Sequence, residues 1–240
     1  MYRQLDPAQI IATAETLSNR IADRFPGSGL SRVATELLEV ARESHASIEQ
    51  MSRPYWPLRL LAWAGAALLV AIVVAAVFTV PLRGAAGGWF DLAQGIEAVV
   101  NEVVFLAIAV FFLFTLESRR RRARALRAIH ELRSIAHIVD MHQLTKDPDA
   151  VMAPERATPS SPDRRSMTRF ELSRYLDYCS ELLSITSKLA ALHAQHVQDP
   201  VVLDAVTGIQ NLTHGLSGKI WQKIMILDSA ARLGRDDRKD

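Results

Sequence analysis

Two apolar runs and the arginines that follow them decide how this chain is organised. Residues 60–80 read LLAWAGAALLVAIVVAAVFTV, and residues 99–122 read VVNEVVFLAIAVFFLFTLESRRRR. At a rise of about 1.5 Å per residue, each apolar run forms a helix comparable to the ~30 Å hydrocarbon core of a bilayer. We therefore predict an all-α integral membrane protein with two transmembrane helices, over residues 58–80 and 97–117 of a hairpin at 54–118.

The distribution of positive residues predicts the orientation of these spans. Arg53 and Arg59 flank the first span and six arginines lie within residues 119–127, whereas the short, glycine-rich connection between the spans holds only Arg83. Because cytoplasmic flanks carry the excess of positive charge, both termini are expected in the cytoplasm. Arginine greatly outnumbers lysine and alanine is abundant, which fits a GC-rich bacterial genome, so we expect a multi-pass protein of the bacterial inner membrane.

Side chains suited to the membrane–water boundary lie at the ends of both spans. Tryptophans favour this boundary, and arginines beside it contact anionic lipid at about 1 kcal/mol per charge. The predicted interface aromatics are Trp56, Trp63 and Trp89, and the predicted topology and lipid-contacting residues are Arg119, Arg120, Arg121, Arg122 and Arg124.

The N-terminal arm, residues 1–53, has the pattern of two amphipathic helices. Asp6-Pro7 is a typical helix start, with Asp at the N-cap and Pro at the first helical position. Residues 26–29, Pro-Gly-Ser-Gly, then break the chain. Short helices are marginal alone, so this cytoplasmic arm needs another surface to pack against.

Helical periodicity does not stop at the end of the second span. It continues through Leu126, Ile129, Leu132 and Val139, so residues 119–145 are predicted to extend that helix into the cytoplasm as far as Leu144. Residues 146–166 hold four prolines among polar residues and are predicted to form a mobile linker.

Residues 167–233 are predicted to form a cytoplasmic helical hairpin, followed by a charged tail at 234–240. Thr168 or Ser166 begins its first helix, and Asp199-Pro200 begins its second. Two adjacent apolar stripes indicate a wide buried face, as in a bundle. One stripe is Tyr175, Tyr178, Leu182, Ile185, Leu189 and Leu192, and the other is Leu172, Leu176, Cys179, Leu183, Thr186 and Ala190.

Three polar residues lie at the outer end of the second span: Glu97, Asn101 and Glu102. Acids inside a span are costly and are functional candidates. In an oligomer, a ring of Glu102 carboxylates could line a pore mouth and favour cations. Alternatively, both acids lie in the headgroup layer and have no such role.

The sequence carries no recognisable catalytic constellation. It has no phosphate-binding glycine loop, no identifiable nucleophile–base pair and no paired carboxylates, so we expect a non-enzymatic protein without cofactor. The single cysteine excludes an intrachain disulfide. His193 and His196 are three residues apart but lack a third ligand on the same helix, so no metal is predicted. A net charge of +2 gives no reason to expect nucleic-acid binding.

Two functions fit this layout. The first is a homo-oligomeric pore or scaffold, in which other subunits cover the apolar faces of the cytoplasmic helices. The second is a membrane-anchored adaptor or stress transducer whose cytoplasmic helices bind a separate protein. The order of a short helical arm, two spans and cytoplasmic helices is similar to two-span effector proteins of bacterial conflict systems, the SLATT type, and this similarity of layout implies no role for any single residue.

Overall fold

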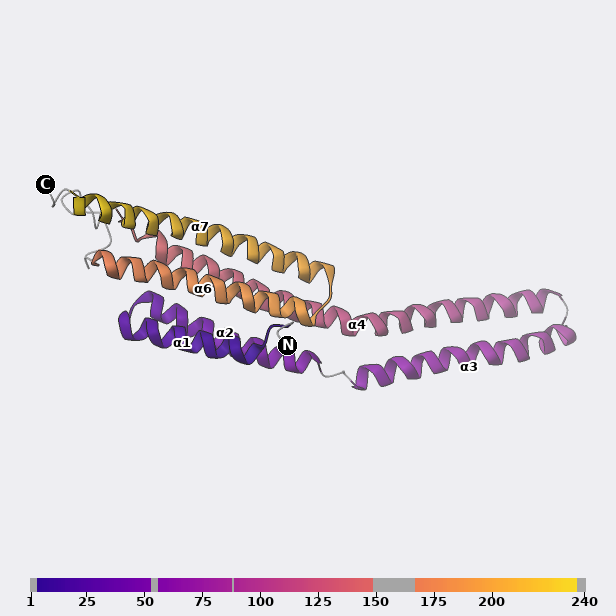
Figure 1. Ribbon diagram of the computed structural model, residues 1–240. Helices are drawn as coiled ribbons and strands as arrows, with labels where there is room; N and C mark the ends of the chain where they lie inside the picture. Colours follow the sequence, from indigo (N-terminus) through magenta and orange to yellow (C-terminus); the bar gives the residue numbers. More distant parts are fainter. Residues whose placement is uncertain (1–3, 53–55, 88, 149–166, 237–240) are drawn as a thin grey trace. The chain divides into compact units, whose positions relative to one another are not determined.

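The computed structural model describes residues 4–52, 56–87, 89–148 and 167–236. The regular structure within these ranges is helical, in agreement with the predicted all-α class (Figure 1). The chain divides into two compact units, which we call the bundle unit, residues 1–50 and 124–240, and the hairpin unit, residues 51–123. The helices are α1 (Pro7–Arg24), α2 (Gly29–Ser52), α3 (Trp56–Gly87), α4 (Trp89–Leu144), α6 (Arg169–His196) and α7 (Pro200–Asp236).

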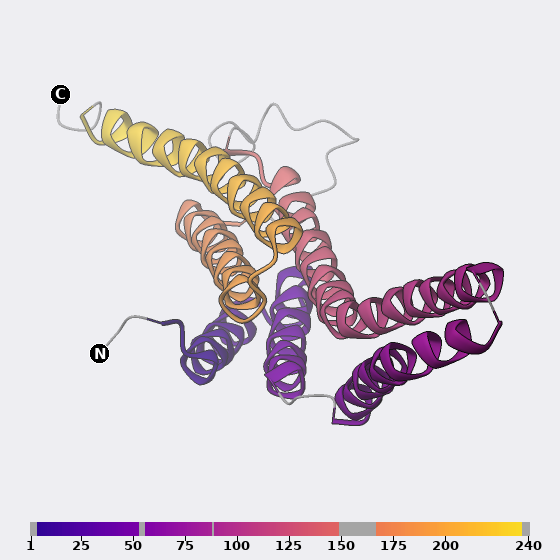
Figure 2. The same cartoon turned by 90° about the vertical axis from the view of Figure 1, so that its right-hand side faces the viewer.

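In the hairpin unit, α3 and the first part of α4 run side by side in opposite directions (Figures 1 and 2). Near the start of α3, the ring of Trp63 meets the ring of Phe114 edge-on, with 6.0 Å between centroids. Gly65 lies so close to α4 that an added Cβ would be 3.1 Å from Cγ2 of Val110. A small residue at this point therefore permits the close approach of the two helices.

One helix of the described chain is both long and apolar enough to cross a membrane. It is the part of α4 that begins at Ala93. The apolar part of α3 recognised by the same criteria, Arg59–Ala75, is shorter than a full span. The structure thus supports one candidate spanning helix, and the second predicted span stays a prediction.

The ends of α3 and α4 at the hairpin turn differ from the sequence-based expectation. Helix α3 continues through Pro81 to Gly87, and α4 already begins at Trp89, so most of the expected glycine-rich connection is helical. Glycine weakens a helix by about 1 kcal/mol, and an interior proline costs about 3 kcal/mol because it removes one backbone hydrogen bond and crowds the carbonyl four residues earlier, which is why the sequence indicated a break here.

The bundle unit consists of α1, α2, the last part of α4, α6 and α7, which lie alongside one another in both views (Figures 1 and 2). Helix α6 is central: every residue of its two predicted apolar stripes is buried. This confirms the wide apolar face read from the sequence. The largest fully buried side chains come from all five helices and include Ile21, Leu30, Leu37, Leu132, Leu176, Leu183, Ile209 and Ile220.

The predicted helix starts are confirmed by their caps. Asp6 Oδ1 accepts a hydrogen bond of 2.9 Å from the backbone N–H of Ala8. Thr168 and Glu171 form a reciprocal capping box at the start of α6. Asp199 Oδ1 accepts from the N–H of Val201, 2.9 Å away. Each cap satisfies backbone donors that have no partner within the helix.

Helix α4 ends at Leu144 as predicted, and a lysine from another helix caps it. Lys223 Nζ on α7 donates to the carbonyl oxygens of Gln143 and Lys146, at 2.8 and 2.9 Å. The Gln143 carbonyl also accepts from the backbone N–H of Lys146 at 3.1 Å, and a cation suits the negative end of the helix dipole. The predicted linker from 149 onward and the last four residues of the tail lie outside the described residues.

Candidate functional site

The polar residues predicted at the outer end of the second span lie on α4 and are exposed: Glu97, Asn101 and Glu102. Glu97 and Asn101 are one helical turn apart and share a face. Glu102 is five positions from Glu97, which turns it to a different side of the helix. Helix α4 therefore places Glu97 and Asn101 on one face. A site shared by all three residues stays a prediction.

The predicted interface tryptophans are exposed on the hairpin unit, with Trp56 and Trp63 each 68% exposed and Trp89 82% exposed. They lie among many other exposed apolar side chains, such as Phe105, which is 75% exposed. Exposed apolar surface of this extent is unusual on a protein surrounded by water. Lipid is a solvent in which such side chains are stable.

The carboxylate of Glu117 on α4 links α3 to α4, just before the run of arginines at residues 119–122. Arg59 Nε donates to Glu117 Oε2 at 3.1 Å, and Arg121 Nη2 donates to Glu117 Oε1 at 2.6 Å. The guanidinium of Arg119 lies 5.3 Å from the centroid of the Phe112 ring. Glu117 thus joins the two helices of the hairpin unit through one carboxylate.

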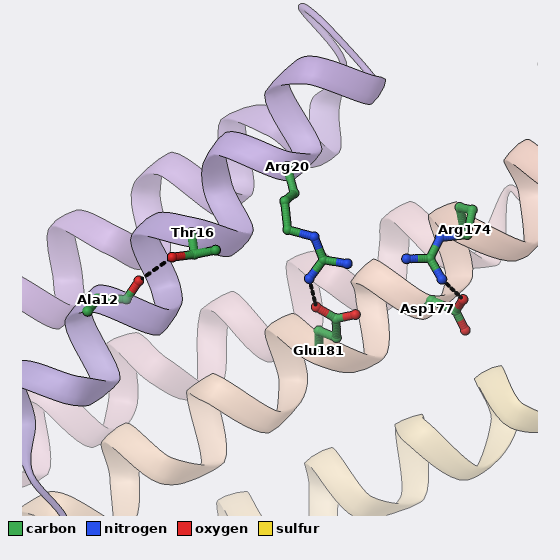
Figure 3. Close-up of polar contacts among 6 residues, drawn as sticks. All are labelled: Ala12, Thr16, Arg20, Arg174, Asp177 and Glu181. Atoms are coloured by element: carbon green, nitrogen blue, oxygen red, sulfur yellow. Dashed lines mark hydrogen bonds and ion pairs between the residues drawn. The ribbon is translucent and has the colours of Figure 1, made fainter.

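A cleft of about 740 Å³ lies between α1 and α6 of the bundle unit. We call it the α1–α6 cleft. At one end, Arg20 Nη1 pairs with Glu181 Oε2 at 3.4 Å (Figure 3). Towards the other end, Gln195 accepts from the backbone N–H of Leu5 at 2.9 Å and donates to its carbonyl oxygen at 3.3 Å.

Between these two links the α1–α6 cleft has a mixed lining. Its apolar part includes the buried side chains of Ile10, Leu17 and Ile185. Thr16 also lines the cleft, and its Oγ1 donates to the carbonyl oxygen of Ala12 at 2.8 Å (Figure 3). Lys188 adds a cation. Apolar concavities with a few polar groups are the usual form of binding sites.

Aromatic and cationic side chains support the Arg20 end of this cleft. The guanidinium groups of Arg20 and Arg174 lie 5.4 and 5.3 Å from the centroid of the Tyr178 ring. Arg174 also pairs with Asp177 at 3.0 Å (Figure 3). The ring of Phe25 meets Tyr178 edge-on, with centroids 6.2 Å apart. These contacts hold the end of α1 in place against α6.

The two histidines of α6 have different surroundings and do not act as a pair. His193 is fully buried, and its Nε2 lies 3.4 Å from the hydroxyl of Ser44 on α2. Its Nδ1 has no hydrogen-bond partner among the described residues. Burial lowers the pKa of His193 to about 4. His196 Nδ1 instead lies 2.9 Å from the carbonyl oxygen of Leu192.

Cys179 lies in the core of α6, where the predicted role as a small buried residue is confirmed. Burial raises the pKa of its thiol to about 12, although Lys223 and Lys146 act in the opposite direction. Because the thiolate is the reactive form, this thiol is inert at neutral pH. Within the described ranges, no three metal-binding side chains of the His, Cys, Asp or Glu type come together.

Several of these contacts have no signal in the sequence. Arg20 and Glu181 are 161 positions apart, and Ser44 and His193 are 149 apart. An exposed charge or a serine on an amphipathic helix carries no information about its partner on another helix. The chain matches no protein-family model, and it matches none of the curated proteins or solved structures with which it was compared.

Proposed function

We propose that this chain is a non-catalytic bacterial inner-membrane protein that anchors a cytoplasmic helical bundle to the bilayer and presents it to a protein partner. In this proposal α3 and the apolar part of α4 cross the membrane as a hairpin, and both termini are cytoplasmic. Of the two functions that fit the sequence, this is the membrane-anchored adaptor or stress transducer.

The observation that carries this choice is the self-sufficient core of the bundle unit. The sequence suggests a homo-oligomer because the amphipathic arm and the C-terminal hairpin need a surface to cover their apolar faces. Residues of α1, α2, α4, α6 and α7 cover one another within a single chain. The demand for other subunits is therefore weaker, and the largest exposed apolar surface belongs to the hairpin unit, where lipid satisfies it.

The α1–α6 cleft is the proposed partner-binding site. A photo-crosslinking amino acid at Thr13, which lines the cleft and is exposed, tests this in living cells. The matched control is Asn19, which is exposed on the same helix but does not line the cleft. We expect Thr13 to capture one cytoplasmic protein reproducibly, and Asn19 to capture it several-fold less.

The crosslinking pattern also separates the two functions. Capture of a distinct protein at Thr13 alone supports the adaptor. Crosslinks only between copies of this chain, or equal capture at Thr13 and Asn19, would contradict the cleft as a site for a separate partner and favour self-assembly.

A pore is the second candidate, and the exposed pair of Glu97 and Asn101 on one face of α4 favours it. Two spans cannot enclose a path, so conduction requires several copies. Native mass spectrometry in lipid nanodiscs would give the number of subunits. Four or more copies, with a conductance that falls in Glu97→Gln, would support the pore, whereas a monomer or dimer would exclude it.

A further inference from the structure

A second cleft lies within the bundle unit between α2 and α4 and encloses about 260 Å³. We call it the α2–α4 cleft. Arg124, Arg127 and Glu131 follow one another at helical spacing on α4, and Glu43 and Ser47 are one turn apart on α2. The small space therefore brings together two guanidinium groups, two carboxylates and hydroxyls. Its polar lining residues are Glu43, Ser44, Ser47, Arg124, Arg127 and Glu131.

We propose that the α2–α4 cleft binds the phosphoethanolamine headgroup of a membrane phospholipid. Guanidinium groups and hydroxyls are strong donors to phosphate oxygens, and carboxylates accept hydrogen bonds from a primary ammonium. The cleft supplies both kinds of group. Two guanidinium groups and two carboxylates give the lining no net positive charge to favour a purely anionic headgroup, and a choline headgroup has no N–H to donate.

The position of this cleft on α4 agrees with a lipid ligand. Arg124 follows Glu117, the last residue of the predicted second span, by seven positions, which is about 10 Å of helix. The headgroup layer adds about 5–8 Å to each side of the hydrocarbon core. The long side chain of Arg124 can reach back to the phosphate layer, whereas Glu131, about 21 Å of helix past Glu117, can meet only the outermost, ammonium end of a headgroup. A volume of 260 Å³ holds about nine water molecules at ~30 Å³ each, which is room for phosphoethanolamine.

Ser44 connects the cleft to the buried histidine. It lines the cleft and is 3% exposed, and its hydroxyl lies 3.4 Å from Nε2 of His193. Because Nδ1 has no acceptor nearby, we assign the ring proton to Nε2, which then donates to Ser44. The hydroxyl proton of Ser44 is thereby left to donate to a phosphate oxygen in the cleft.

The test uses the full-length protein in nanodiscs that contain equal amounts of phosphatidylethanolamine, phosphatidylcholine and phosphatidylglycerol. Lipids that remain bound after release are identified by native mass spectrometry. We expect phosphatidylethanolamine to exceed each of the other lipids by about tenfold, since hydrogen bonds between charged groups give differences of this size. Glu43→Gln/Glu131→Gln should abolish its preference over phosphatidylcholine, and Arg124→Ala/Arg127→Ala should abolish all enrichment.

The matched control is Arg133→Ala/Lys219→Ala, which removes two exposed charges from the bundle unit outside the cleft and should keep the preference. Circular dichroism checks that every variant remains folded. Equal retention of the three lipids by the wild type, preference for phosphatidylglycerol, an equal loss in the control, or tighter binding of soluble phosphoethanolamine than of the lipid would overturn this inference. The inference rests on the proposed membrane insertion: a protein that does not insert refutes both, whereas insertion without enrichment refutes only the lipid site.

Discussion

His193 is a polar side chain in an apolar core, where it links α6 to α2. Its Nε2 faces Ser44, and no acceptor or donor among the described residues reaches Nδ1. Protonation would place a charge in this core with a single weak partner, which is why burial depresses its pKa. The same side chain, when unfolded, titrates near 6.5. This difference makes the stability of the bundle unit depend on pH.

We predict that the bundle unit loses stability as the pH falls from about 6.5 to about 4. Below 6.5 the unfolded state binds a proton that native His193, with a pKa of about 4, does not accept, so acid favours unfolding. The full effect of His193 is about 3 kcal/mol. Burial together with Arg32 and Lys146 also lowers the pKa of His142, which acts in the same direction. Thermal unfolding followed by circular dichroism at pH 7 and pH 4.5 measures the change.

His193→Gln is the matched variant for this measurement, because it removes the titrating group and keeps a polar side chain. The melting temperature of His193→Gln should depend less on pH than that of the wild type. The dependence that remains should come from His142. An equal fall in melting temperature in both proteins would contradict the assignment to His193.

Two glycines in helices should respond oppositely to alanine. A Cβ on Gly29 would collide with Cε1 of His142, so Gly29→Ala must displace the imidazole and is expected to cost about 1–2 kcal/mol. Gly215 has no atom within 4 Å of its added Cβ, and Gly215→Ala should stabilise α7 by about 0.5–1 kcal/mol. Melting temperatures of the two variants check this, and a shift of the same sign in both would contradict the packing at Gly29.

At the scale of the helices, the sequence predicts starts, ends and buried faces well because these are local properties. Asp6, Thr168 and Asp199 act on backbone groups two or three residues away, so each cap is visible in the sequence. The stripes of α6 follow from helical periodicity alone. In contrast, the cap of α4 comes from Lys223, 77 to 80 residues away, and no local pattern identifies it.

We predict that Lys223→Met loosens the junction between α7 and the end of α4. The methionine keeps most of the apolar stem but removes both hydrogen bonds to the carbonyl oxygens of Gln143 and Lys146, at a cost of about 1–3 kcal/mol. Hydrogen exchange of the amides in the last turn of α4 should rise. Lys219→Met, at an exposed position of α7, is the control and should leave that exchange unchanged. Equal protection in both variants would argue against this cap.

At the scale of the whole molecule, the two units differ in the surroundings that suit their composition, lipid for the hairpin unit and water for the bundle unit. The hairpin unit exposes large apolar side chains, whereas the bundle unit buries most of its own in a continuous core. The sequence predicts this division because the apolar runs of the hairpin are nearly free of charge. It does not predict the α1–α6 and α2–α4 clefts, because each requires the relative placement of two helices distant in the sequence.

In the proposed topology, α3 and α4 cross the membrane as a hairpin and leave α1 and the end of α4 on the cytoplasmic side. The side of the membrane is tested in three variants that each add one cysteine, Asn19→Cys, Gln94→Cys and Ser134→Cys. Each variant is treated with a membrane-impermeant maleimide. All three positions are exposed, and Cys179 is buried with a thiol pKa of about 12, so the wild type serves as the unlabelled control. We predict that intact cells label only Gln94→Cys, and that permeabilised cells label all three. Labelling of either Asn19→Cys or Ser134→Cys in intact cells, or protection of Gln94→Cys until permeabilisation, would contradict the hairpin.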